Sequence, residues 1–462
     1  MNQNPCAFSK KSPIFPLDSR SDFKKCQNLP DLNAKRALTN IVTLRNLAGF
    51  SLTYLTKQDQ LNLFDTLMTA GLIFLFVLGF WLWHNHFVWK KNGGEIEFYF
   101  MLQVICIYHF LFVFIFHEYI QKYGGDAISY WELTAVKKTL MDHSWWDYWG
   151  DRSAWIEWIN YWPAKILGWD IFYGHLFYAS VSYLGIHLLA KLWQNSLPSP
   201  KNKAWTILYV LPFFLPNLHF WTSGIGKEAW LLLGLALSTK GWQNWNKNYV
   251  WGILGVLLSF WVRPANGAIL GFITIILALG KASNNKKIPW WGWVSAGLFL
   301  GLMSFGVIRY MHLDSLTLDS LRRFSSLQFA SLEKLGAASQ MPMQEYGWLK
   351  RLFTVAFRPI WENNFSVTYL ISGMENALAL FFTLMAVWGF LKARIRKKMP
   401  WWIWAGLAYC IALLFVHTLT LNNLGIMMRM KSVGMFFVYL AGTWSLLGTN
   451  KYSTHSGSAG MN

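Results

Sequence analysis

Apolar segments recur along most of this chain and limit what it can fold into. Hydrophobic residues make up 54% of the 462 residues and charged residues only 14%, too apolar a composition for a soluble multidomain protein. We predict an all-α polytopic membrane protein with about 11 transmembrane helices, in a range of 10–12. The apolar segments cover residues 63–84, 97–117, 171–193, 204–220, 229–240, 249–262, 265–280, 289–308, 369–391, 401–420 and 433–448.

The segments between Trp205 and Gly280 are shorter than the roughly 20 residues that cross a bilayer. We expect tilted, broken or re-entrant helices there, which membranes tolerate where the backbone lines a cavity. Polar residues 1–60 form an extension, disordered or interfacial and without a signal peptide. Residues 61–450 are expected to be one membrane domain, and residues 451–462 a cytoplasmic tail.

Basic residues lie in every second loop between the apolar segments and predict the orientation. Such clusters mark cytoplasmic loops, so the net charge of +19 does not indicate nucleic-acid binding. The alternate loops are then outside, including two long outer loops at residues 118–170 and 309–368. The basic loops contain Lys90–Lys91, Lys191 with Lys201 and Lys203, Lys240 with Lys247, Lys281 with Lys286 and Lys287, and a run that ends at Lys398.

Five cations are expected at the outer side, where lysine and arginine are usually depleted. Arg263 and Arg358 each precede a proline, which places them at helix breaks. Lys227 begins a predicted helix that Thr222 or Ser223 can cap, and a helix N-terminus beside a cation binds anions. Each cation alone is equally an interfacial or snorkelling side chain. Together they favour a pyrophosphate site, formed by Lys227, Arg263, Arg358, Arg429 and Lys431.

Carboxylates and aromatic residues at the same side suggest sugar chemistry. Asp126 follows Gly124–Gly125, where it is either a helix N-cap or a catalytic base. Glu375 lies within an apolar helix, a costly position that ionisable groups occupy mainly for function. Aromatic rings pack against the C–H faces of sugars, although most tryptophans here fit a membrane-interface belt equally well. The expected catalytic residues are Asp126, Glu132 and Glu375, and the expected sugar-binding residues are Tyr130, Trp131 and Trp221.

Neither a metal nor a cofactor is expected. The four cysteines lack metal-ligand spacing, and the segment GIGKE lacks the spacing of a nucleotide-binding P-loop.

Ordered motifs resemble a known family. They are GGDAISYWELTA, NLHFWTSGIGKEAW, WVRPANGAIL, FRPIWENN with GMENALAL, and NNLGIMMRMKS, within residues 95–448. This series is similar to bacterial exopolysaccharide and O-antigen repeat-unit polymerases (Wzy-type, EpsG-like). The chain departs from that pattern in its polar N-terminal extension and in Lys431, where a second arginine often stands.

The resemblance implies a multi-pass glycosyltransferase of the bacterial plasma (inner) membrane. Such an enzyme polymerises polyprenyl-pyrophosphate-linked oligosaccharide repeats at the outer face of the bilayer, with chain-length regulator and flippase proteins as partners. One alternative is a lipid-phosphosugar-dependent transferase of the GT-C type, which adds single sugars and needs a metal. Another is an exporter of polysaccharide or lipid-linked sugar, although transporters place their sites near the midplane rather than at one mouth.

The alternation of basic loops gives a direct test of topology. A single cysteine at Ser283 should react with an impermeant reagent only from the cytoplasm, and one at Ser331 only from outside. Labelling of both positions from the same side would contradict the predicted orientation.

Overall fold

The computed structural model describes residues 57–92, 95–137, 143–197, 200, 202–285, 294, 297–298, 301, 317–334, 339–360 and 366–450. Nearly all of the predicted N-terminal extension, the predicted tail and the predicted segment 289–308 lie outside these residues. The chain divides into two compact units, Met1–Leu72 and Ile73–Asn462, and every contact described below belongs to the second unit.

The described residues are helical and contain no strand, apart from an isolated bridge between Gln340 and Asn423. Among the described residues, five helices are long and apolar enough to cross a membrane. The prediction of an all-helical fold with membrane-spanning candidates is therefore confirmed, whereas a count of about 11 spans is not. The five helices are α3 (Lys57–Asn92), α4 (Ile96–Tyr123), α16 (Val367–Leu391), α18 (Trp401–Thr420) and α19 (Leu424–Asn450).

Four further helices coincide with predicted apolar segments: α7 (Ile171–Ser196), α10 (Lys227–Gln243), α11 (Trp245–Val262) and α12 (Pro264–Asn285). The segment 204–220 is broken, as expected, into α8 (Lys203–Val210), the 3₁₀ turn η4 (Leu211–Phe214) and α9 (Pro216–Thr222). Pro212 and Pro216 explain the breaks, because proline lacks the N–H that a helix interior requires.

Two of these helices pack with their backbones unusually close. Gly241 of α10 faces Gly252 of α11, and Gly234 faces Gly255 and Ser259. A Cβ at Gly241 would collide with the backbone of Gly252, so the approach depends on small residues, as in many membrane helix pairs.

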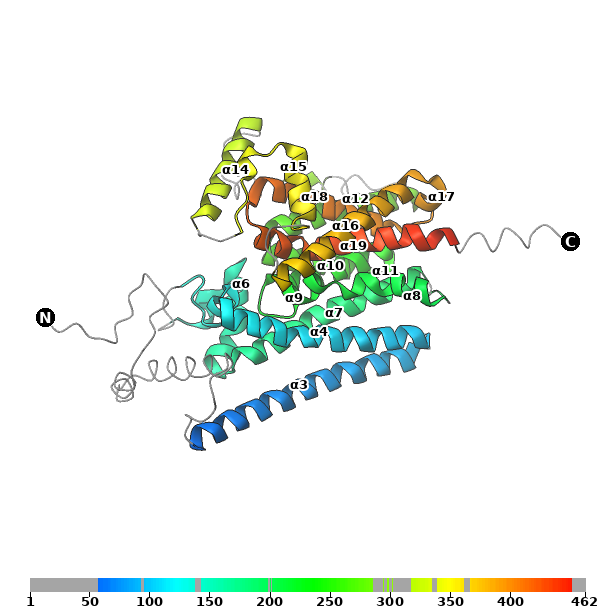
Figure 1. Ribbon diagram of the computed structural model, residues 1–462. Coiled ribbons are helices and arrows are strands. Elements are labelled where there is room, and N and C mark those ends of the chain that lie inside the picture. The colour runs from blue at the N-terminus through cyan, green and yellow to red at the C-terminus, as the bar shows by residue number, and fades with distance from the viewer. Residues whose placement is uncertain are drawn as a thin grey trace. The chain divides into compact units, whose positions relative to one another are not determined.

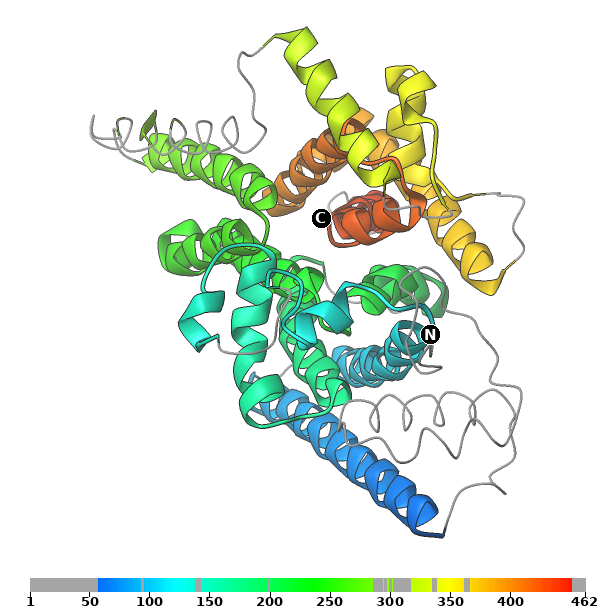
Figure 2. The ribbon, with the colours of Figure 1, turned by 90° about the vertical axis from the view of Figure 1, so that its left-hand side faces the viewer.

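The two predicted outer loops contain short helices. The first holds α5 (Asp126–Trp131), η2 (Trp145–Tyr148), α6 (Ser153–Asn160) and η3 (Tyr161–Ile166), and the second holds α14 (Leu318–Glu333), η5 (Met343–Glu345) and α15 (Trp348–Phe357). In Figure 1, α6, α14 and α15 lie at one end of the helices, and α8 and α17 (Ala393–Arg396) lie at the other. Figure 2 views the second unit from the former end, where the candidate site lies.

Glu157 of α6 holds the chain that follows α5. Its Oε1 accepts hydrogen bonds from the backbone N–H groups of Ala135 (2.5 Å) and Val136 (3.1 Å). Burial raises the pKa of this carboxyl above its ordinary value, while the two backbone donors act in the opposite direction. These bonds fix the position of the segment that carries Asp126 and Tyr130 relative to α6.

Candidate functional site

Glu228, in the first turn of α10, is the centre of the candidate site. Gly226 is the N-cap of this helix, and no side chain caps it. The hydroxyls of Thr222 and Ser223 bond instead to the carbonyls of Leu218 and Phe220, so the predicted capping role is wrong. The N-terminal turn of α10 therefore already holds an anion, the Glu228 carboxylate, and the Glu228 side chain is only 2% exposed.

Two arginines pair with Glu228. Arg429 of α19 binds both carboxylate oxygens, with Nε 2.8 Å from Oε1 and Nη2 3.0 Å from Oε2. Arg263 adds a contact of 2.5 Å from Nη2 to Oε1. Arg263 has extended backbone between α11 and α12, as its position before Pro264 predicted. Because a buried carboxylate is costly to desolvate, the two cations are what make this position of Glu228 possible.

Asp126 is the outer partner of Arg429. Its Oδ2 accepts a hydrogen bond from Arg429 Nη1 at 2.8 Å, and its side chain is 59% exposed. Gly125 is the N-cap of α5, so Asp126 lies within the first turn and the alternative of a capping role is wrong. Arg429 thus joins a buried carboxylate on one side to an exposed one on the other.

Lys227 completes the cation group. Its Nζ donates to Ser153 Oγ at 3.0 Å and lies 5.6 Å from the centre of the Tyr130 ring. Burial, followed by the charge of Asp126, raises the pKa of Tyr130, which stays neutral at physiological pH. We call Asp126, Lys227, Glu228, Arg263 and Arg429 the charge cluster. Its three cations face two carboxylates, which leaves one net positive charge.

The three predicted sugar-binding aromatics differ in position. Trp221 is half-buried, and the centre of its ring lies 5.5 Å from the guanidinium carbon of Arg429. Tyr130 is buried beneath Lys227. Trp131 is packed against Gly174 of α7, and its indole N–H donates to the carbonyl of Trp169. The sugar-binding prediction for Trp131 is therefore not supported.

Glu132, Arg358 and Lys431 lie outside the charge cluster. Glu132 is exposed at the C-cap of α5. Arg358 ends α15 in extended backbone, as expected before Pro359, and its carbonyl accepts a hydrogen bond from Lys431 Nζ at 3.1 Å. Lys431 is 2% exposed and also donates to the carbonyl of Ala356, so it is not an open anion ligand.

The separation of Lys431 from Arg429 follows from the helix that carries both. The sequence predicts an apolar segment only from residue 433, and it places both cations in one pyrophosphate site before that segment. In the structure α19 begins at Leu424, so Arg429 and Lys431 project about 200° apart around its axis. The prediction of a single group of five cations is corrected to a group of three, with Arg358 and Lys431 outside it.

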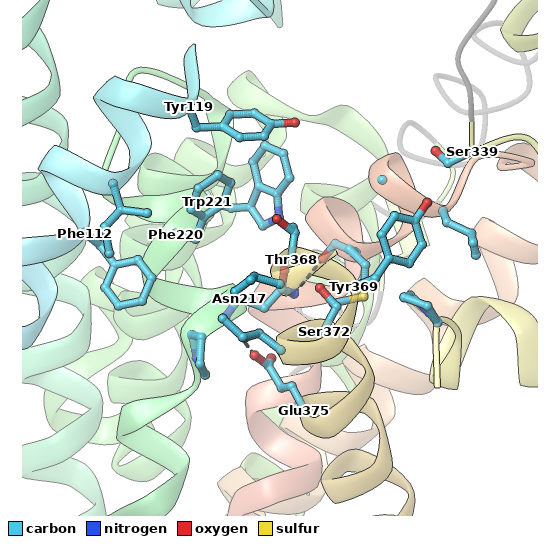
Figure 3. A pocket seen from close by; sticks show the side chains of 18 of the residues that line it. Phe112, Tyr119, Asn217, Phe220, Trp221, Ser339, Thr368, Tyr369, Ser372 and Glu375 are labelled. Atoms are coloured by element: carbon cyan, nitrogen blue, oxygen red, sulfur yellow. Dashed lines mark hydrogen bonds between the residues drawn. The ribbon is translucent and has the colours of Figure 1, made fainter. Parts of the chain in front are cut away.

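A cavity of about 660 Å³ lies next to the charge cluster. Residues of α4, α9, α16 and α19 line it, including Trp221, Met428 and the buried Glu375 (Figure 3). Glu375 Oε2 accepts a hydrogen bond of 2.8 Å from the backbone N–H of Asn217. The structure thus separates the predicted catalytic residues: Asp126 belongs to the charge cluster, and Glu375 belongs to the cavity.

Sequence reasoning missed Glu228, although a signal for it was present. It is an acidic residue at the start of an apolar helix, and the argument that selected Glu375 applies to it equally. Ser153 and Asn217 carried no such signal, because single polar residues near helix ends are common. In the described part of the chain, no group of three His, Cys, Asp or Glu side chains is placed to hold a metal ion.

Comparisons with protein-family models, with curated proteins and with solved structures found no match to this chain. The family resemblance therefore rests on the sequence motifs alone, and the site must be interpreted from its own geometry.

The Glu228 ion pairs should contribute measurably to stability. We expect Glu228→Ala to destabilise the protein by about 3–5 kcal/mol, because it leaves two largely buried arginines without this partner. The exposed pair of Arg322 and Asp319 on α14 provides a control, and Arg322→Ala should cost less than about 1 kcal/mol. Thermal unfolding of the detergent-solubilised variants measures both. Equal unfolding temperatures for the two variants would contradict this role of Glu228.

Proposed function

We propose that this chain polymerises polyprenyl-pyrophosphate-linked oligosaccharide repeats into an exopolysaccharide or O-antigen at the outer face of a bacterial plasma membrane. The observation that carries the proposal is the charge cluster itself. Three cations from three separate regions of a membrane-helical chain meet around one buried carboxylate, with an exposed carboxylate at the edge. A flippase that supplies the repeats and a chain-length regulator are the proposed protein partners.

The pyrophosphate would bind at Arg429 and Lys227. Glu228 binds one edge of the Arg429 guanidinium and is itself bound by Arg263, while Arg429 Nη1 faces the exposed Asp126. An incoming phosphate oxygen can replace that carboxylate, and the neighbouring Lys227 offers a second cationic donor. Because Glu228 keeps the guanidinium in position, little reorganisation is needed when the leaving group gains charge.

The transfer step then requires a base, for which Asp126 is well placed. The acceptor hydroxyl oxygen attacks the anomeric carbon of the growing glycan, and the bond from that carbon to the pyrophosphate oxygen breaks. Asp126, released from Arg429, takes the hydroxyl proton. The electron pair of the broken bond remains on the pyrophosphate, where Arg429 and Lys227 stabilise the charge.

Deletion of the gene tests the proposed function as a whole. Single lipid-linked repeats should accumulate at the outer leaflet. Accumulation of truncated repeats would instead indicate a single-sugar transferase, and accumulation at the cytoplasmic leaflet would indicate an exporter.

Substitution of Lys227 tests the proposed role of the cations in pyrophosphate binding without breaking the ion pairs of Glu228. We expect Lys227→Gln to slow polymerisation of purified lipid-linked repeats by about 10²–10³, the usual effect of removing one charge-stabilising donor. Arg322→Gln, on the exposed face of α14, should polymerise at the wild-type rate. A Lys227→Gln protein with wild-type turnover at equal abundance would exclude this lysine from the site.

Asp126→Asn separates a base from a simple counterion of Arg429. The amide keeps the shape and the oxygen that Arg429 contacts, but it has no useful basicity. We expect turnover to be lost, whereas farnesyl pyrophosphate should bind at least as tightly as to wild type, because a competing negative charge is gone. Turnover within a few-fold of wild type would remove Asp126 from the mechanism and leave Glu132, Glu375 or His117 of α4 as the next candidates.

A further inference from the structure

We infer that the cavity lined by α4, α9, α16 and α19 is a saccharide subsite, which holds the acceptor sugar with Glu375 at its floor. That the bound sugar is the acceptor rests on the proposed function. That a sugar binds in this cavity is argued from the residues that line it. A volume of about 660 Å³ falls within the usual range of small-molecule sites, roughly 300–1,000 Å³.

One wall of the cavity is aromatic. Phe112 and Tyr119 of α4 lie with Phe220 and Trp221 of α9 on one side of the space (Figure 3). The faces of such rings carry partial negative charge, which attracts the C–H groups on the flat faces of a pyranose ring. Trp221 also contacts the Arg429 guanidinium, so this wall continues to the charge cluster.

The opposite wall comes mainly from α16 and carries polar side chains among apolar ones. Thr368, Ser372 and Glu375 recur at intervals of three or four residues, so they share one face of that helix. Tyr369 and Ser339 add two more hydroxyl groups at the same side (Figure 3). A ring of hydroxyl groups can bond to this wall while its C–H face packs against the aromatic wall.

Glu375 is fixed in place and retains acceptor capacity. The Asn217 backbone N–H donates to Oε2, and the Asn217 side chain is held in turn by the Met428 carbonyl at 2.8 Å. A carboxylate has about four lone-pair positions, so one such hydrogen bond leaves room for sugar hydroxyls. In Figure 3 the carboxylate extends from α16 towards Asn217 at the bottom of the cavity.

This lining does not suit a polyprenyl chain, although most of its area is apolar. Glu375 is buried and Ser372 is half-buried, and an alkyl occupant would exclude water from both while offering them no hydrogen-bond partner, which is costly. A sugar can form hydrogen bonds with the polar side chains of α16 and pack its C–H face against the aromatic wall.

The subsite also lies where an acceptor is needed. Met428 lines the cavity, and the next residue of α19 is Arg429, the main proposed pyrophosphate ligand. A sugar in the cavity is therefore adjacent to a donor held at the charge cluster.

Protection of a cysteine from alkylation tests the subsite directly. In a protein whose four native cysteines are replaced by alanine, Ser372→Cys places a thiol in the cavity. Leu370→Cys, on the exposed face of the same helix, is the matched control. The probes are neutral oligosaccharides released by mild acid from the host's surface glycan, and farnesyl pyrophosphate.

We expect the oligosaccharides to slow alkylation of Ser372→Cys by N-ethylmaleimide several-fold and to leave Leu370→Cys unaffected. Adding Glu375→Gln should raise the oligosaccharide concentration for half-protection about tenfold or more, since a hydrogen bond to a charged group is lost. Absence of protection by any oligosaccharide, or protection by farnesyl pyrophosphate alone, would overturn the subsite. The polymerase proposal fails separately, if the gene deletion accumulates no single lipid-linked repeats.

Discussion

The ion pairs of Glu228 with Arg263 and Arg429 are the constraint on which the rest of the site depends. They join the start of α10 to the α11–α12 junction and to α19, three places far apart in sequence. A buried carboxylate is unfavourable unless cations and hydrogen bonds compensate for its lost hydration, so these elements must meet closely. The same pairing fixes the Arg429 guanidinium, and it leaves Nη1 facing an exposed carboxylate that a ligand can replace.

Helix α19 connects the two parts of the proposed active region. Met428 faces the cavity, Arg429 faces the charge cluster, and Lys431 is turned inward to the carbonyls of Ala356 and Arg358. An α-helix turns about 100° per residue, so neighbouring residues of one segment can serve a sugar site, an anion site and the packing of a loop. This arrangement explains why the charge cluster and the cavity lie together, with Trp221 of the cavity wall in contact with Arg429 of the cluster.

The features that the sequence predicted correctly are those that local patterns of residues determine. Apolar runs located the long helices, proline placed Arg263 and Arg358 at helix ends, and the broken segment before Trp221 was expected. Pairing between distant segments could not be predicted in this way, because no local pattern specifies that Arg429 meets Glu228 rather than a ligand. The last apolar segment was predicted to start at residue 433, whereas α19 starts at Leu424, and this longer helix turns Lys431 away from Arg429. The packing of Trp131 could not be predicted for a related reason, since its partner, Gly174, belongs to another helix.

The most direct test of this account is an experimental structure in a lipid nanodisc with a polyprenyl-pyrophosphate-linked repeat bound. We predict a phosphate oxygen within hydrogen-bond distance of Arg429 Nη1, with Asp126 displaced and Glu228 still bound to both arginines. A pyrophosphate bound away from Arg429 and Lys227, or a Glu228 side chain separated from the arginines in the bound state, would contradict it.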